Sequence, residues 1–402
     1  MNTYISSGPF IPITEHEQSA FCRTEEPLVV KPLAEEFAAA VTWQNIAPEY
    51  HHLGGEELAG RIRAARETLG DKLVILGHHY QRDEVIQFAD FRGDSFKLSQ
   101  YAAGQKNAEY IIFCGVHFMA ETADILSASH QKVILPNSTA GCSMADMART
   151  EDVDDCWDEL EQVLGAGGII PITYMNSTAA IKALCGRNNG IVCTSSNALE
   201  VFQWAFQRGE RVVFFPDQHL GRNTAHKMGF SESDMLVWNP FKHLGGHTPE
   251  KLQQAKVVLW QGHCSVHTRF TVDQIQRARS AYPDVNVIVH PECISDVVAA
   301  ADSDGSTEYI AKVIGEAASG SKWAVGTEIS MVNRLAQEHP DKLIFCLDSV
   351  VCPCSTMYRT HPAYLLAAMD NLINGEVVNQ IRVDEDTSFH ARVALQRMLL
   401  EI

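Results

Sequence analysis

The strongest constraint on the fold is a series of short apolar runs that begins near residue 71 and recurs to about residue 350. The runs are rich in β-branched and aromatic residues, and polar residues, glycine or proline follow each one. Segments with helical periodicity lie between them, such as TVDQIQRARSAY and STEYIAKVIGEAA. Near-continuous apolar strands that alternate with helices are typical of parallel sheets covered on both faces. The sequence therefore predicts an α/β fold.

The runs group into three loose blocks, which predicts three similar small α/β domains with parallel sheets arranged around a central active site. Before them, GEELAGRIRAARETLG and LAEEFAAAVTWQNIAPEY predict helices of an N-terminal extension that covers a domain face or forms an oligomer contact. We also expect a helical segment in DEVIQFADFRGDSFKLSQYAA, and an amphipathic helix in HPAYLLAAMDNLING before a short polar tail. The expected boundaries are 1–70 for the extension, 71–158, 159–250 and 251–350 for the domains, and 351–402 for a C-terminal segment that returns to the core.

Charge and composition limit the partners of the chain. Its 402 residues include 50 acidic and 32 basic side chains, for a formal net charge of −18. This balance argues against nucleic acid and against acidic membrane surfaces, because both are polyanions. No apolar run approaches the roughly 20 residues that span a bilayer, and the first residues lack a secretory pattern. Eleven scattered cysteines do not resemble a disulfide scaffold. We therefore expect a cytoplasmic protein.

Histidine, cysteine and tyrosine follow many of the apolar runs, where turn chemistry alone favours glycine, proline, asparagine, aspartate and serine. Ligands of parallel α/β sheets bind beyond the carboxyl ends of strands, so these side chains predict a shared polar site. The strand-end candidates are His78, Tyr80, Tyr174, Asn176, Ser195, His267, His290 and Glu292. Ser95, Ser306 and Thr307 stand at expected helix N-termini, where they either bind an anion or act as simple caps.

Three cysteines each follow a strand and stand beside glycine, proline or histidine: Cys142, Cys264 and Cys354. Each is a candidate metal ligand, although a cysteine at such a place is more often a buried small hydrophobe. Cys352 competes with Cys354 for a ligand role, because the CPC spacing is too tight for both. No CxxC pair, Walker loop or GxSxG motif is present. The residues alone thus predict a three-block α/β enzyme with a cysteine- and histidine-rich site, but no particular reaction.

Ten strand-end strings, taken together and in order, resemble the quinolinate synthase family over about residues 72–370. They are HHYQ, GDS, TYMNST, CTSSN, PDQHLG, QGHCSVH, VHPE, GSTEYI, GTE and CPCSTM. Each string is weak by itself, but their common order makes coincidence improbable.

The resemblance implies an enzyme of de novo NAD biosynthesis that condenses iminoaspartate with dihydroxyacetone phosphate to quinolinate, phosphate and water. It also implies a 4Fe–4S cluster with three cysteine ligands and one open iron, which by motif fall on Cys142, Cys264 and Cys354. Tyr80, Glu292 and His267 (or His290) would transfer protons. The substrate-binding residues would be His78, Ser95, Tyr174, Asn176, Ser195, His290, Ser306 and Thr307. An aspartate-oxidising enzyme is the expected source of the imine.

Two other interpretations compete with this one. His263, His267, His290 and Glu292 could ligate a single zinc or iron ion in a hydrolase or aldolase-like lyase. Tandem α/β domains around a cleft also serve as non-catalytic binding proteins for small molecules. The first alternative predicts metal without sulfide, and the second predicts no cofactor.

Overall fold

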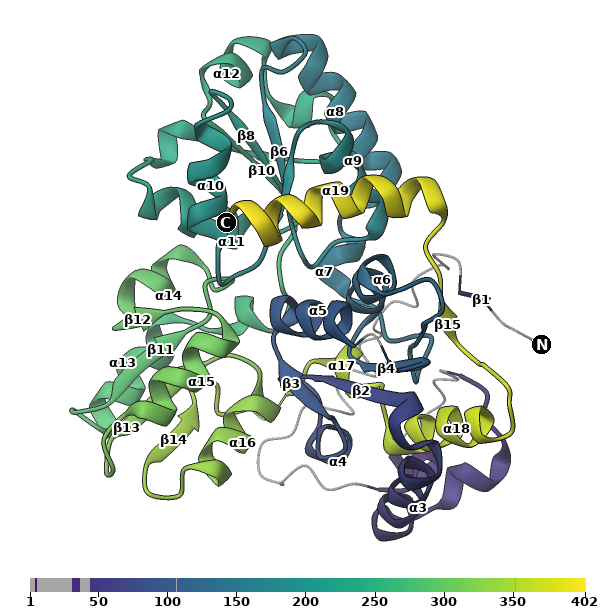
Figure 1. The fold of residues 1–402 in the computed structure, drawn as a ribbon. Coiled ribbons are helices and arrows are strands. Elements are labelled where there is room, and N and C mark those ends of the chain that lie inside the picture. The colour runs from purple at the N-terminus through teal and green to yellow at the C-terminus, as the bar shows by residue number, and fades with distance from the viewer. Residues whose placement is uncertain (1–3, 6–30, 37–43, 106, 351) are drawn as a thin grey trace. The chain divides into compact units, whose positions relative to one another are not determined.

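The computed structural model describes residues 4–5, 31–36, 44–105, 107–350 and 352–402. The chain is an α/β protein with three regions of parallel sheet and a helical N-terminal stretch, as the sequence predicts (Figure 1). By its internal contacts it divides into two units. The first comprises Met1–Cys142 and Thr327–Val383, and the second comprises Ser143–Gly326 and Asp384–Ile402. The three-domain boundaries expected from the sequence stay a prediction.

The first unit contains a six-stranded sheet with the order β1-β15-β5-β4-β2-β3. Its strands are β1 (Tyr4–Ile5), β2 (Leu73–His78), β3 (Phe91–Gly93), β4 (Tyr110–Cys114), β5 (Lys132–Ile134) and β15 (Gln380–Ile381). The central strands β2, β4 and β5 pair in parallel, and β15 closes onto β5 in the antiparallel direction. A further strand of this unit is β14 (Leu343–Cys346).

The long helices α3 and α18 pack together in the first unit (Figure 1). Leu58, Ile62, Ala65 and Leu69 form a helical stripe on α3 and share one core with α18 and with strand residues such as Ile75. The N-terminal extension therefore covers a sheet face, which is one of its two expected roles. The helices here are α2 (Leu33–Glu36), η1 (Pro48–His52), α3 (Gly55–Leu69), η2 (Gly70–Lys72), α4 (Asp83–Ile86), α5 (Ser95–Gly104), α6 (His117–Leu126), α16 (Ile329–Glu338), α17 (Ser355–Tyr358) and α18 (Pro362–Ile373).

The second unit contains a five-stranded sheet with the order β7-β6-β8-β10-β9, and a further sheet in which β11 pairs in parallel with β12 and β13. The strands are β6 (Ile170–Tyr174), β7 (Ile191–Cys193), β8 (Val212–Phe215), β9 (Met235–Trp238), β10 (Val257–Trp260), β11 (Asn286–Val289), β12 (Ser303–Asp304) and β13 (Lys322–Gly326). We expected β10 to open the third block. It pairs instead with β8 and β9.

The chain ends in a long helix, α19, that the sequence analysis did not anticipate. We expected a short polar tail after residue 375, but α19 runs from Glu385 to Glu401 and packs along α9 (Figure 1). Its polar residues face outward around a narrow buried stripe. The other helices of this unit are α7 (Ser143–Asp146), α8 (Thr150–Leu164), α9 (Ala179–Arg187), α10 (Ala198–Phe206), α11 (Gln218–Lys227), η3 (Glu232–Asp234), η4 (His243–Gly246), α12 (Pro249–Gln254), η5 (His267–Arg269), α13 (Val272–Ala281), α14 (Ser295–Ala300) and α15 (Thr307–Glu316).

Other differences from the sequence-based expectations concern short elements. The ten apolar runs predicted as strands are strands, but five further strands were not predicted: β1, β3, β9, β12 and β15. All of these except β9 are only two or three residues long. The segment read as one helical stretch after residue 82 is α4, β3 and α5. The helix expected from residue 33 is α2 followed by η1, and residues 37–43 lie outside the described residues. Within the described chain, no helix combines the length and the apolar character needed to cross a membrane.

Candidate active site

The buried strand β2 of the first unit ends in a turn that fixes Tyr80. His78 is the last residue of the strand, and its Nδ1 accepts a hydrogen bond from the backbone N–H of Tyr80 at 3.1 Å. The two rings meet edge to face, with centroids 4.9 Å apart. The Tyr80 hydroxyl lies 2.8 Å from Oγ1 of Thr327. This strand end therefore presents a half-buried phenol whose oxygen is held by a hydrogen bond.

Arg334 of α16 holds the same turn from the other side. Its guanidinium donates to the carbonyl oxygens of His79, at 2.8 Å, and Gln81. It also bonds the Asp83 carboxylate at 2.7 Å. A planar guanidinium suits this task because it offers several donors in a rigid fork. Sequence reasoning missed Arg334, since nothing in the pattern of an ordinary helix indicates a partner about 250 positions earlier.

The GDS segment begins a helix, which is the simpler of the two interpretations given for it. Asp94 is the N-cap of α5 and accepts a hydrogen bond from the backbone N–H of Lys97 at 2.9 Å. Ser95, a half-buried residue, opens the helix. The capping role belongs to Asp94, so the anion-binding role expected for Ser95 stays a prediction.

Free cysteines fall into two groups by exposure. Of the nine that the described residues contain, five are fully buried, and the others are partly exposed: Cys142, Cys264, Cys346 and Cys354. The three expected ligands all belong to the accessible group. Cys346 donates instead to the carbonyl oxygen of Thr327, at 3.8 Å. Cys352, the rival of Cys354, is disulfide-bonded.

Glu328 anchors the segment that carries Cys354. Its carboxylate accepts hydrogen bonds from the backbone N–H groups of Cys354 at 3.1 Å and of Ser330 at 2.8 Å. Burial raises the pKa of Glu328 to about 7, although these hydrogen bonds oppose the shift. Thr356 adds a contact of 3.4 Å to the Cys354 sulfur. The GTE string contained both Thr327 and Glu328, but its roles in holding Tyr80 and Cys354 were not foreseen.

A buried histidine–glutamate pair forms the centre of the second unit. His267 Nδ1 lies 2.7 Å from Glu292 Oε2, and the two side chains are 1% and 3% exposed. The His290 ring stacks on that of His267 with a centroid distance of 4.4 Å. Tyr174, at the end of β6, hydrogen-bonds to the Glu292 carboxylate. The structure thus brings together four residues that the sequence placed at the ends of three strands.

The charges in this cluster set the protonation of its members. Burial alone would raise the pKa of Glu292, but electrostatic interaction with the two imidazoles and the hydrogen bonds from His267 and Tyr174 hold this pKa below its ordinary value. Burial, followed by the charge of His267, lowers the pKa of His290 to about 3. At neutral pH the cluster therefore holds an ionised carboxylate beside a neutral His290 imidazole.

Cys264 lies beside the His267–Glu292 pair. Each of the three residues offers one atom that could bind a metal ion, and these three atoms lie within 4.8 Å of one another. Among the described residues, no other group of histidine, cysteine and acidic side chains has this arrangement. Of the four ligands expected for a mononuclear hydrolase or lyase, only His267 and Glu292 belong to this group of three. His263 and His290 do not.

Hydrogen bonds to two of its carbonyl oxygens hold the loop from Tyr174 to Thr178. Ser177 donates from Oγ to the carbonyl oxygen of Tyr174 at 2.8 Å, and the fully buried ammonium of Lys182 donates to the carbonyl oxygen of Ser177. Asn176 Oδ1 and Thr178 Oγ1 are buried and have no hydrogen-bond partner among the described residues. Since unsatisfied buried polar atoms are costly, a bound substrate is one way to satisfy them.

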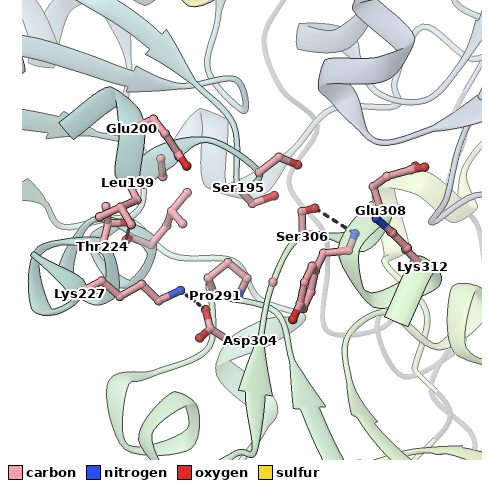
Figure 2. A pocket seen from close by; sticks show the side chains of 15 residues that line it. Ser195, Leu199, Glu200, Thr224, Lys227, Pro291, Asp304, Ser306, Glu308 and Lys312 are labelled. Carbon is pink, nitrogen blue, oxygen red and sulfur yellow. Dashed lines mark hydrogen bonds and ion pairs between the residues drawn. The ribbon is translucent and has the colours of Figure 1, made fainter. Parts of the chain in front are cut away.

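Ser195 and Ser306 line a common pocket of about 400 Å³ in the second unit (Figure 2). Ser306 caps α15 by accepting a hydrogen bond from the backbone N–H of Tyr309 at 3.3 Å. The next residue, Thr307, is buried, and its Oγ1 has no partner within the described chain. An ion pair between Lys227 and Asp304 forms part of the wall. Helix N-termini with free hydroxyls favour anions.

The sequence-derived candidates are thus divided between the two units. The second unit holds Tyr174, Asn176, Ser195, Cys264, His267, His290, Glu292, Ser306 and Thr307, and the first holds His78, Tyr80, Ser95, Cys142 and Cys354. Within each unit they lie at strand ends and helix starts, as expected.

An α/β fold with ionisable and thiol side chains gathered at strand ends defines a metabolic enzyme with a buried acid–base centre. Comparisons with known proteins specify it further. The family model described as quinolinate synthetase A protein matches residues 60–400. The chain belongs to this family.

Named relatives agree with the family match. A quinolinate synthase of Corynebacterium glutamicum is 60% identical over 362 residues, which cover 90% of this chain and 92% of that protein. The quinolinate synthase of Streptomyces coelicolor is 55% identical, with coverage of 85% and 88%. One from Bacillus anthracis is 51% identical, with coverage of 89% and 96%.

Proposed function

We propose that this chain is a quinolinate synthase that condenses iminoaspartate with dihydroxyacetone phosphate to quinolinate, phosphate and water, in de novo NAD biosynthesis. The family match over residues 60–400 carries the assignment. The buried Glu292–His267 pair, with its Tyr174 bond, supplies the acid–base centre that such a reaction requires.

The condensation needs protons removed beside a carbonyl and added to departing oxygens. Glu292 is ionised at neutral pH, so it can accept a proton, and His267 at 2.7 Å orients the carboxylate. The Tyr80 hydroxyl is a phenol that can donate a proton, and its bond to Thr327 aims it. We assign Tyr80, His267 and Glu292 the proton-transfer roles.

The substrates carry carboxylates and a phosphate. Tyr174 and Asn176 would position the carbon skeleton, because Asn176 Oδ1 lacks a partner and Tyr174 already contacts the base. Ser195, Ser306 and Thr307 would hold an anionic group at the pocket and at the start of α15. His78, Ser95 and His290 complete the proposed substrate-binding set.

The donor set fits an iron–sulfur cluster. Cys142, Cys264 and Cys354 are partly exposed and lie outside any disulfide, whereas five other described cysteines are fully buried. Thiolates are the ligands of such clusters. We propose that these three cysteines hold a 4Fe–4S cluster. When bound, it supplies an open iron that acts as a Lewis acid toward a substrate oxygen or nitrogen.

The chemistry of the imine indicates a supplier. Iminoaspartate hydrolyses readily in water, so an enzyme that oxidises aspartate must produce it close to its use. Nine of the ten described cysteines form no disulfide, Cys352 being the exception. Because disulfides are rare in reducing compartments, we propose the cytoplasm.

Anaerobic purification tests the proposal. We expect about four iron and four sulfide per chain, with broad absorbance near ~400 nm typical of thiolate-bound clusters. Quinolinate should form when the protein receives dihydroxyacetone phosphate and freshly generated iminoaspartate. A zinc or iron ion without sulfide, and no quinolinate, would favour the mononuclear hydrolase or lyase instead.

A further inference from the structure

The acid–base centre of the second unit has the composition of a zinc site. Cys264, His267 and Glu292 offer a thiol, an imidazole and a carboxylate whose ligand atoms lie within 4.8 Å of one another. Zinc binds these groups at about 2.0–2.3 Å in a tetrahedron, which spaces the ligand atoms roughly 3.3–3.8 Å apart. Binding would therefore replace the 2.7 Å hydrogen bond between His267 and Glu292 by bonds to the cation and bring the Cys264 sulfur closer.

The scaffold around these side chains resembles that of a built metal site. His267 and Glu292 are almost fully buried, and Tyr174 bonds the carboxylate, as outer partners of metal ligands commonly do. Cys264 is partly exposed, so a cation can reach the site from its side. The three residues come from the loop after β10, from η5 and from the end of β11, and a ligand would therefore join separate elements.

A second buried carboxyl, Asp217, points to a cation independently. Asp217 is fully buried at the start of α11. Its Oδ1 accepts hydrogen bonds from the backbone N–H groups of His219 and Leu220 at 2.6 and 2.9 Å, whereas Oδ2 has no partner among the described residues. A divalent cation would give this buried Oδ2 atom an electrostatic partner.

We infer that Cys264, His267 and Glu292 bind a single borderline-soft divalent cation of the Zn²⁺ type, with the Asp217 carboxyl adjacent. Thiolate and imidazole ligands exclude Mg²⁺ and Ca²⁺, which require oxygen. Given the proposed function, Cys264 is also a cluster ligand, so the cation and the cluster exclude each other. The cation form lacks both the cluster and a free Glu292 base, and it is inactive.

The test uses the full chain, stripped of iron and sulfide under anaerobic conditions and titrated with Co²⁺ as a spectroscopic probe. We expect one Co²⁺ per chain, a thiolate-to-cobalt charge-transfer band, and displacement by Zn²⁺. Cys264→Ser should abolish the band. His267→Gln and Glu292→Gln should weaken Co²⁺ binding by roughly 10–100-fold, with far-ultraviolet circular dichroism confirming that each variant is folded.

Matched variants separate this inference from the proposed function. Cys142→Ser and Cys354→Ser should lose the cluster and keep Co²⁺ binding, while His267→Gln should bind Co²⁺ more weakly, as stated above, and still assemble iron and sulfide. If no variant assembles a cluster but Co²⁺ binds as described, the proposed function fails and this site stands. Absence of Co²⁺ binding, an unchanged Cys264→Ser titration, or equal losses in Cys142→Ser and Cys354→Ser would overturn the site.

Discussion

Tyr80 and Glu292 differ in what holds their reactive oxygens. The Tyr80 hydroxyl has a neutral hydroxyl neighbour, Thr327, at 2.8 Å, whereas Glu292 lies 2.7 Å from an imidazole and keeps its charge. Interactions with His267 and Tyr174 hold the pKa of Glu292 below its ordinary value and favour its carboxylate form, whereas the Tyr80 hydroxyl carries a proton that it can donate. The two residues are therefore suited to opposite halves of proton transfer.

Replacing Tyr80 by phenylalanine removes the hydroxyl, and with it the proton and the hydrogen bond to Thr327. We expect turnover to fall by about 10²–10⁴-fold, the usual contribution of general acid–base catalysis, while iron and sulfide content stay unchanged. Thr327→Val is the matched control, because it keeps the phenol and removes its partner, and it should cost less. Steady-state rates of quinolinate formation measure both. Wild-type turnover in Tyr80→Phe would exclude Tyr80 from catalysis.

His361 makes stability depend on pH. It caps α18 by accepting from the backbone N–H of Ala363, and its Nε2 bonds the carbonyl oxygen of Lys31. Burial, followed by the charge of Arg82, lowers the pKa of His361 to about 4, from 6.5. The unfolded state therefore binds a proton first as pH falls, and stability present above pH 6.5 is lost toward pH 4.

The loss attributable to His361 should be about 3 kcal/mol over that interval. We expect His361→Asn, which retains a capping oxygen, to be less stable at pH 7 and to show a flatter pH dependence. Chemical unfolding from pH 4 to 7 measures the difference. Parallel curves for the two proteins would show that His361 does not carry the proton linkage.

Single residues were predictable where the signal was local. Tyr80, His267 and Glu292 stand directly after apolar runs, so their places at strand ends follow from the pattern. The hydrogen-bond partners of these residues do not follow from the pattern. Thr327 is 247 positions from Tyr80, and no local rule indicates that two particular strand ends will meet. Asp217 follows an apolar run and Arg334 lies within an ordinary helix, and only tertiary contacts give them a role.

The same distinction holds for whole elements. Ten strands and the helix α3 carry strong periodic patterns and were predicted, whereas α19 was not. Its 17 residues are mostly polar, and only Ala391, Ala394, Leu395 and Met398 are buried. Only a narrow stripe of α19 packs against α9, so the helix leaves almost no periodic apolar pattern in the sequence. Its stability comes from this packing and not from intrinsic helix propensity.

Because α9 and α19 pack closely, we expect that adding one methyl group to α9 at their contact will destabilise the protein. A Cβ at Gly186 of α9 would collide with the carbonyl oxygen of His390 in α19. Gly186→Ala should therefore destabilise the protein by about 1–3 kcal/mol. Gly60→Ala in α3 is the control, because a Cβ there has no neighbour within 4 Å, and it should stabilise by roughly 0.5–1 kcal/mol. Denaturant unfolding distinguishes them, and equal effects would contradict close packing of α19 on α9.

At the scale of the molecule, both units are built from discontinuous stretches of chain. The first is closed by Thr327–Val383 and the second by Asp384–Ile402. The boundaries predicted from the sequence divide the chain at successive positions and stay a prediction, because local patterns contain no information about which distant segment completes a unit.

The proposed cluster ligands are distributed over this whole chain, and a cysteine series tests them together. Cys142, Cys264 and Cys354 are accessible thiols, and each serine variant should assemble less than about a tenth of the wild-type iron and sulfide, because an alcohol is a poor substitute for a thiolate. Cys352→Ser is the matched control two positions from Cys354. Since Cys352 is already disulfide-bonded, its loss should leave the cluster intact. A normal cluster in Cys354→Ser together with none in Cys352→Ser would move the third ligand to Cys352 and require that disulfide to open before assembly.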